Sequence, residues 1–314
     1  MEFIPFAFCE SVCQSLDTLD NQLLQVNRAT FWGEAAAETS NRRVNVVLNI
    51  SYRVPATSYH DTAWSHKFEV LNELNQPKYS ITFDELQKLN RQHLHVTQVK
   101  IGVGLPPMAS LEDISEIVQF TIPFLYSTSL TISKEPQSNE KASSLALTTL
   151  LSFYRNVPIS TLFCLDNGRP VEEFLIKQLE ESTASDFQLI LSPMEQWSED
   201  VQVAVEQFAL FKPFKSLTFY NDTFLFSKTF FERVFEKTLT GLEFTFNGYF
   251  SFDYNELQEF KPEIQDAAES ARLPTEWPHV GAKFQNVVWR RADGVQVTAT
   301  CLRKCWYMRW SGIE

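Results

Sequence analysis

Glycine is scarce in this sequence, with only nine among 314 residues. Loops that cradle phosphate groups depend on glycine, because a side chain would keep the backbone from approaching the ligand. The nearest candidate is Gly102-Val103-Gly104, but Leu105-Pro106-Pro107 follows it where a dinucleotide-binding loop would lead into a helix. The sequence therefore argues against a nucleotide-binding fold.

Signatures of catalysis are missing as well. The chain contains no Gly-x-Ser-x-Gly, His-Glu-x-x-His or P-loop pattern, which are spacings that bring catalytic groups together in known enzymes. We therefore expect that the protein is not an enzyme. Catalytic groups can also converge from distant positions, so an enzyme of unrecognised class remains an alternative.

Basic residues are outnumbered, with 27 Lys and Arg against 39 Asp and Glu and a formal net charge of -12. An acidic surface repels phosphate groups, so we expect neither nucleic acid nor a membrane as a partner.

No apolar run reaches the ~18 residues of a membrane span. Glu10 and Asp17 interrupt the apolar start, which a secretory signal would not allow. With an odd number of cysteines, this favours a cytoplasmic or nuclear protein with reduced thiols.

The sequence contains few closely spaced residues that could bind a metal ion. The closely spaced pairs are Cys9/Cys13, Cys301/Cys305 and His93/His95. A structural zinc site needs four convergent ligands, and no nearby Cys or carboxylate completes any pair at a known spacing. We expect the cysteines to be small core residues, and we expect no metal and no cofactor.

Phenylalanine is the abundant apolar residue, with 27 copies, and it falls in elements that recur. An alternating strand pattern runs from Val46 to Val54. Weaker strands are predicted at 66–71 and 78–83, and Asp84 is the predicted N-cap of a helix over Glu85–Gln92. From about residue 95, short apolar strands recur every ~25–32 residues, at 96–103, 129–132, 161–165, 187–191, 216–220 and 242–246. Helical patterns fall at 141–155, 170–182, 197–211, 226–237 and 254–270.

A strand and a helix at this period are typical of a stacked solenoid. The predicted fold class is therefore α/β, with an irregular leucine-rich-repeat-like body over residues 43–280. Several strands are followed by Asn or Asp, as in Asn221-Asp222 and Asn247-Gly248, which in leucine-rich repeats bonds the backbone of neighbouring coils. An ordinary α/β domain with evenly spaced strands is the alternative.

The last residues, 281–314, differ from the body. Alternating stretches at Phe284–Arg291 and Val295–Arg303 flank Ala292-Asp293-Gly294, and Asp-Gly in this context predicts a β-hairpin. Three of the seven Trp residues lie here, namely Trp289, Trp306 and Trp310. They are expected to cap the open end of the solenoid, although an exposed binding surface is the other interpretation.

The first residues, 1–42, predict short amphipathic helices. Phe8, Val12 and Leu16 recur at helical spacing with Cys9 and Cys13. With Ile4-Pro5 before them, and Asn21-Gln22-Leu23-Leu24, Val26-Asn27-Arg28 and Trp32 after them, the pattern resembles an F-box. Cys stands twice where the family has Leu or Ile, and Trp32 lies a residue or two late. The whole chain resembles the nematode-expanded F-box-like families that carry irregular leucine-rich or FTH-type repeats.

This resemblance implies a protein-interaction module, an F-box-type substrate-recruiting subunit of a cullin-RING ubiquitin ligase. Its partners would be a Skp-type adaptor, bound by the N-terminal helices, and an unidentified target protein, bound by the repeats. By match to the motif, the adaptor-binding face would consist of Ile4, Pro5, Phe8, Val12 and Leu16. A stand-alone scaffold whose decayed F-box start merely packs on the body is the alternative.

Overall fold

The alternating and the helical patterns of apolar residues in the sequence correspond to a mixed α/β structure with a mostly parallel sheet. The computed structural model describes residues 8–9, 12–13, 24–25, 31–53, 62–72, 74–102, 109–125, 128–133, 140–165, 168–182, 186–191, 197–219, 224–238, 244–252, 265–266, 285–290, 296–302 and 305–311. The chain separates into two units, Met1–Ile159 and Ser160–Glu314.

The first unit is built around a long central strand. Its strands are β1 (Val44–Arg53), β2 (Ala63–Leu71), β3 (Pro77–Ile81), β4 (Leu94–Ile101) and β5 (Thr128–Ile132), in the order β5-β4-β1-β2-β3. β1 pairs in antiparallel fashion with β2 and in parallel with β4, which pairs in parallel with β5. β1 was predicted by its alternation, and Val46, Leu48 and Ile50 are fully buried. Its position between β2 and β4 was not predicted.

In the described part of this unit, four α-helices with known bounds accompany these strands. They are α3 (Phe31–Arg42), α4 (Phe83–Lys88), α5 (Leu111–Thr121) and α6 (Glu140–Tyr154). The N-cap predicted at Asp84 is wrong, because Thr82 caps α4: its hydroxyl accepts from Glu85 N, and the Glu85 carboxylate accepts from Thr82 N. This reciprocal capping box satisfies two backbone donors that Asp84, already inside the first turn, does not satisfy.

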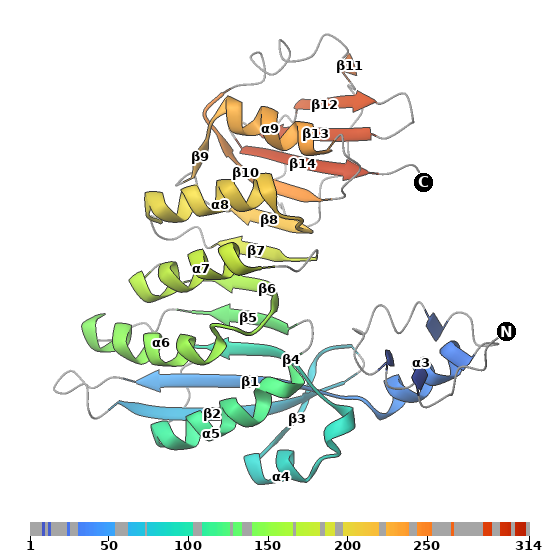
Figure 1. Ribbon diagram of the computed structural model, residues 1–314, viewed down its shortest axis with the longest axis vertical. Coiled ribbons are helices and arrows are strands. Elements are labelled where there is room, and N and C mark those ends of the chain that lie inside the picture. The colour runs from blue at the N-terminus through green and yellow to red at the C-terminus, as the bar shows by residue number, and fades with distance from the viewer. Residues whose placement is uncertain are drawn as a thin grey trace. The chain divides into compact units, whose positions relative to one another are not determined.

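The second unit repeats a strand and a helix. The parallel strands β6 (Ile159–Cys164), β7 (Gln188–Leu191), β8 (Ser216–Phe219) and β10 (Thr245–Phe250) follow one another in chain order, and the two-residue strand β9 (Leu225–Phe226) pairs with β10. Between them come α7 (Arg169–Glu181), α8 (Glu199–Phe211) and α9 (Lys228–Thr238). Figure 1 shows these three helices side by side on one face of the sheet. The strands and helices predicted for this stretch are confirmed within a few residues.

The core of the second unit consists largely of phenylalanine rings. Phe219, Phe226 and Phe246 lie within 5.3–5.6 Å of one another, measured between ring centroids. Gly248 passes under this cluster: a Cβ there would lie 3.0 Å from the Phe246 ring and 3.1 Å from the Phe226 ring. The strand predicted at 242–246 lies a few residues later, at Thr245–Phe250, and the glycine within it leaves room for the rings.

The C-terminal strands are antiparallel. They are β11 (Gln265–Asp266), β12 (Gln285–Arg290), β13 (Gln296–Leu302) and β14 (Cys305–Ser311). The predicted hairpin is confirmed, since β12 pairs with β13; β13 continues to β14, which pairs with β10. The side chains of the three C-terminal Trp residues lie outside the described part, so their capping role stays a prediction. The helix predicted over 254–270 also lies outside it, except at β11, which is a strand.

Candidate protein-interaction surfaces

In the described part of the N-terminal residues, two cysteines pack on α3. Cys9 and Cys13, one helical turn apart, are buried against Ala35 and Ala36, and Leu24 and Trp32 border this cluster. We call these residues the N-terminal core. The expectation that both cysteines are core residues is confirmed. Its described members are small side chains at the centre, Cys and Ala, and large ones, Leu24 and Trp32, at the border.

Polar bonds supplement this small core. The Gln25 amide donates from Nε2 to Ser40 Oγ at 2.7 Å and to the Ala36 carbonyl at 3.4 Å. The Arg43 guanidinium donates from Nη2 to the Cys13 carbonyl at 3.1 Å. These bonds tie the N-terminal helical residues to α3 and to the residue that follows it.

Burial keeps Cys13 a thiol. It raises the pKa of Cys13, and the neighbouring Cys9 raises it further, against an opposing effect of Arg43. A nucleophilic or metal-ligating cysteine needs its thiolate, which a raised pKa disfavours. Cys13 therefore has the properties of a packing residue rather than of a reactive site.

Of the five residues assigned to the adaptor face, the structure describes two. Phe8 has 54% of its surface exposed, and its ring meets Trp32 edge-to-face with centroids 6.2 Å apart. Val12 is half-buried. The other three, Ile4, Pro5 and Leu16, lie outside the described residues. A large aromatic ring thus stands open to solvent beside two cysteines that point into the N-terminal core.

Trp32 is the functional candidate whose role sequence reasoning missed. The motif placed it in the F-box pattern, but nothing in the spacing indicated that its ring supports Phe8. Because the two residues are 24 positions apart, only the packing of the N-terminal helical residues on α3 brings the rings together. Together they form an aromatic surface, Phe8 and Trp32, that we call the Phe8 surface.

The second unit offers a different kind of surface on its sheet. Leu162, Leu189 and Leu217 point to the helix side and are buried. The side chains that alternate with them face the other way and are half-buried: Thr161, Phe163, Gln188, Ile190, Ser216 and Thr218. Four of these six are neutral and polar, as expected for a sheet face that touches water or a partner rather than a core.

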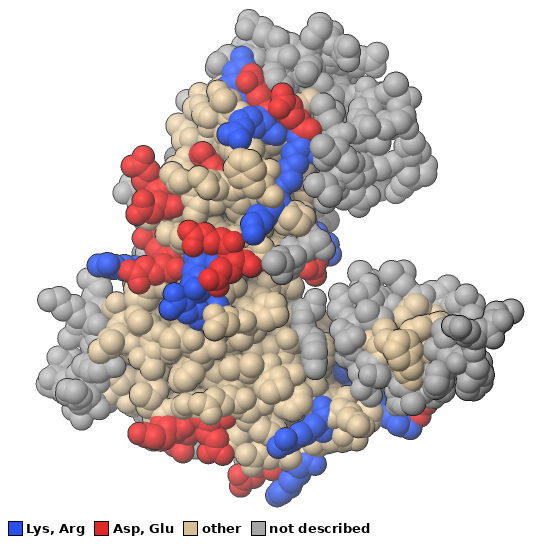
Figure 2. All heavy atoms as spheres, in the orientation of Figure 1, with Lys and Arg blue, Asp and Glu red and all other residues tan. Residues whose placement is uncertain are grey.

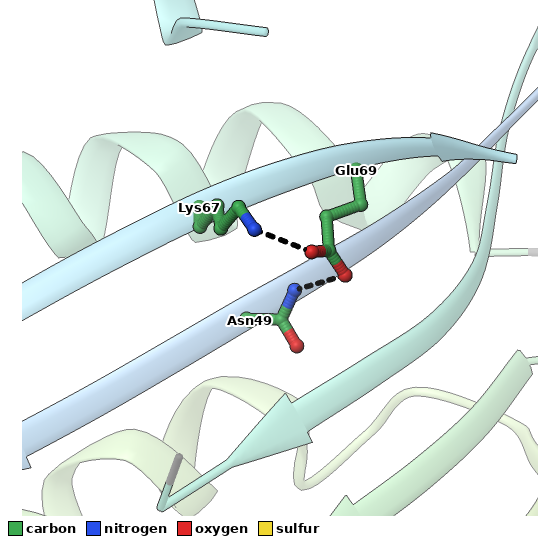
Figure 3. A network of polar contacts seen from close by, with 3 residues as sticks. All are labelled: Asn49, Lys67 and Glu69. Carbon is green, nitrogen blue, oxygen red and sulfur yellow. Dashed lines mark hydrogen bonds and ion pairs between the residues drawn. The ribbon is translucent and has the colours of Figure 1, made fainter. Parts of the chain in front are cut away.

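A polar network lies on the sheet of the first unit. The Glu69 carboxylate accepts from Lys67 Nζ at 2.6 Å and from Asn49 Nδ2 at 3.2 Å (Figure 3). The bond from Lys67 holds the pKa of Glu69 below its usual range, while burial opposes this shift. Beside it, the hydroxyls of Ser51 and Ser65 bond across the same strand pair at 2.5 Å. These bonds join β1 to β2 and pair the polar side chains with one another. No ligand is needed to explain why these side chains lie together.

The two histidines of the pair lie in different elements. His93 lies in a 3-10 turn, Arg91–His93, just before β4, whereas His95 is buried in β4. In the described part of the chain, no group of three or more His, Cys, Asp or Glu side chains is placed to hold a metal ion. Within the same residues, no helix is long and apolar enough to span a bilayer.

Comparison with known proteins adds nothing to this description, since no family model, curated protein or solved structure matches the chain.

Proposed function

We propose that the protein is a protein-interaction module that acts as an F-box-type substrate-recruiting subunit of a cullin-RING ubiquitin ligase. In this proposal the N-terminal helices dock on a Skp-type adaptor, and the strand and helix units, as an irregular leucine-rich-repeat-like solenoid, hold a target protein. The half-exposed ring of Phe8 is the observation that carries the proposal. It belongs to the residues that the F-box resemblance assigns to the adaptor face.

The packing of the N-terminal residues also favours docking. Short helices are marginal in water, and they gain stability by burying an apolar face against a partner. Here Cys9 and Cys13 are buried in the N-terminal core, while Phe8 remains exposed. A stand-alone scaffold would not need an aromatic ring at this place.

The repeated units support the target-binding half of the proposal. In the second unit, parallel strands in chain order alternate with helices that cover one face. The other face presents a row of neutral polar side chains, including Gln188, Ser216 and Thr218. Repeated strands of this kind generate an extended surface that can recognise a folded protein.

The test is a titration of the full-length protein with a purified Skp-type adaptor, followed by calorimetry. We expect binding by the unsubstituted chain and a loss of about tenfold or more in affinity for Phe8→Asp, because a buried aromatic anchor dominates small interfaces. Leu74→Asp is the matched control, since Leu74 is also exposed in the first unit but lies in a turn between β2 and β3. Phe8→Asp combined with Val12→Asp should abolish binding while circular dichroism stays unchanged.

Two results would count against the proposal. If the soluble, folded protein binds no adaptor, the ligase function is wrong and the stand-alone scaffold is favoured. If Phe8→Asp and Leu74→Asp bind as tightly as the unsubstituted chain, the adaptor contacts another surface.

A further inference from the structure

A hollow lies between α7 and α8 on the helix side of the second unit. Its volume is about 620 Å³, within the range of ligand and peptide sites. Leu179 and Phe208 are buried among its lining residues, and Ile176 and Ala204 are half-buried. Its lining on α8 runs from Asp200 to Lys212, essentially the whole helix. On α7 the lining is shorter, from Ile176 to Glu180, so the groove follows one side of α8 and meets α7 over about one turn.

The helix α8 has two apolar sides, of which one is buried inside the protein. Val201, Val205 and Phe208 recur at helical spacing and are buried. Val203 and Phe211 lie on another side, line the groove, and have 49% and 69% of their surfaces exposed. Two large apolar side chains left open beside a hollow indicate an interaction site rather than scattered surface residues.

The distance between these two side chains defines the spacing that a partner's apolar side chains would need. Val203 and Phe211 are eight residues apart, which is about 12 Å along the helix. The Arg233 guanidinium of α9 lies 5.7 Å from the centroid of the Phe211 ring, and this cation-π contact helps to orient the ring. A partner helix with apolar side chains seven or eight residues apart would match this spacing.

The charges of the groove are unequal at its two ends. Asp200 is exposed in the first turn of α8, where the groove begins. At the far end, the Lys212 ammonium donates to the Glu180 and Ser182 carbonyls of the α7 terminus, at 3.3 Å each. That amine is therefore engaged in capping α7, and the exposed side chain of Glu180 lines the same end, so this end carries one acidic and one basic side chain. Figure 2 shows the result on this side of the second unit, with uncharged surface over α8 bordered by acidic and basic side chains.

We propose that this groove binds an amphipathic helix of a partner protein. The partner helix carries two apolar anchors about two turns apart, which contact Val203 and Phe211, and a Lys or Arg at the end that meets Asp200. Apolar anchors on one helical face inserted between two helices are a recurring mode of peptide recognition. The opposite charge at one end fixes the direction in which the helix lies. This binding is independent of the adaptor and involves only the second unit.

The test selects 16-residue helical peptides from a displayed library against the full-length protein. We expect enriched peptides to carry apolar residues seven or eight positions apart with a basic residue at one end. By fluorescence anisotropy, Val203→Ala with Phe211→Ala should weaken their binding about tenfold or more. Leu225→Ala is the control, because Leu225 has the same exposed fraction as Val203 but lies in β9.

A charge exchange tests the direction. Asp200→Lys should weaken binding of the basic peptide, and replacing the peptide's basic residue by Glu should restore it. Failure to enrich any such peptide, or equal affinity for the alanine variant and the unsubstituted protein, would overturn the proposal. So would a dimer, seen in sedimentation, that Phe211→Ala dissociates, because the groove would then bind a second copy of this chain.

Discussion

The described residues of the N-terminal core and those of the core of the second unit, which we call the phenylalanine core, differ in the size of their side chains. The first packs two cysteines against two alanines. The second packs fully buried rings, among them Phe219, Phe226 and Phe246. Each buried phenylalanine contributes about 1.5–3 kcal/mol relative to an exposed one, and a methyl group contributes much less. Loss of one side chain should therefore cost more in the phenylalanine core than at the cysteines and alanines of the N-terminal core.

The largest effect should come from removing one ring of the phenylalanine core. Phe246→Ala removes a side chain that contacts Phe219, Phe226, Phe230 and Phe250. We expect it to lower the free energy of unfolding by about 3–5 kcal/mol, because the surrounding rings cannot fill the cavity completely. Urea denaturation measures the loss. Phe211→Ala, at an exposed ring, is the control; a similar loss in both variants would contradict the account.

A second change overfills the same core. Gly248→Ala places a methyl group 3.0 Å from the Phe246 ring and 3.1 Å from the Phe226 ring. We expect a destabilisation of about 1–3 kcal/mol, because rings packed on several sides cannot move aside without straining others. If the substitution leaves the urea midpoint unchanged, the phenylalanine core is looser than its contacts indicate.

The matching change in the N-terminal core should be milder. Cys13→Ala removes one buried sulfur next to Ala35 and Ala36, and we expect a cost of about 1 kcal/mol. The cost should appear as faster hydrogen exchange of α3 amides, with the second unit unaffected. A loss as large as that of Phe246→Ala would remove the difference between the two cores.

The smallest effect concerns a lysine beside the phenylalanine core. Lys237 of α9 donates from Nζ to the carbonyl of Ala209, at 2.7 Å, and to that of Lys212, and burial lowers its pKa to about 8. Between pH about 8 and 10 the unfolded chain therefore binds more protons than the folded chain, so stability should rise with pH. We expect the free energy of unfolding to rise with pH in the unsubstituted protein relative to Lys237→Met. If the two pH profiles are parallel, the ammonium is as well solvated in the folded chain as in the unfolded chain.

Elements with a strong local pattern could be predicted from the sequence. The alternation of Val46, Leu48 and Ile50 identified β1, since one face of this strand is uniformly apolar. The helix α5 was missed although its signals were present: Ser110 and Asp113 form a capping box, and Ile114, Ile117 and Val118 recur at helical spacing. The error at α4 was of the same kind, because Thr82 and Glu85 carried the capping signal.

Features that depend on contacts between distant residues could not be predicted. No local pattern places β1 between β2 and β4, because alternation shows which side chains share a face but not which strand is the neighbour. The support of Phe8 by Trp32 is equally nonlocal. The groove between α7 and α8 was also missed, although the apolar positions Val203 and Phe211, outside the buried stripe of α8, were a sequence signal for it.

Amide hydrogen exchange of the full-length protein, measured with and without a Skp-type adaptor, tests the central claim most directly. The account predicts that α3 exchanges faster than α7 and α8 in the free protein, and that the adaptor slows exchange in α3 while leaving α7 and α8 unchanged. Equal protection of α3 and α8 in the free protein, with no change in α3 at saturating adaptor, would contradict it. In that case the N-terminal helices would need no partner, and the Phe8 surface would not be a docking site.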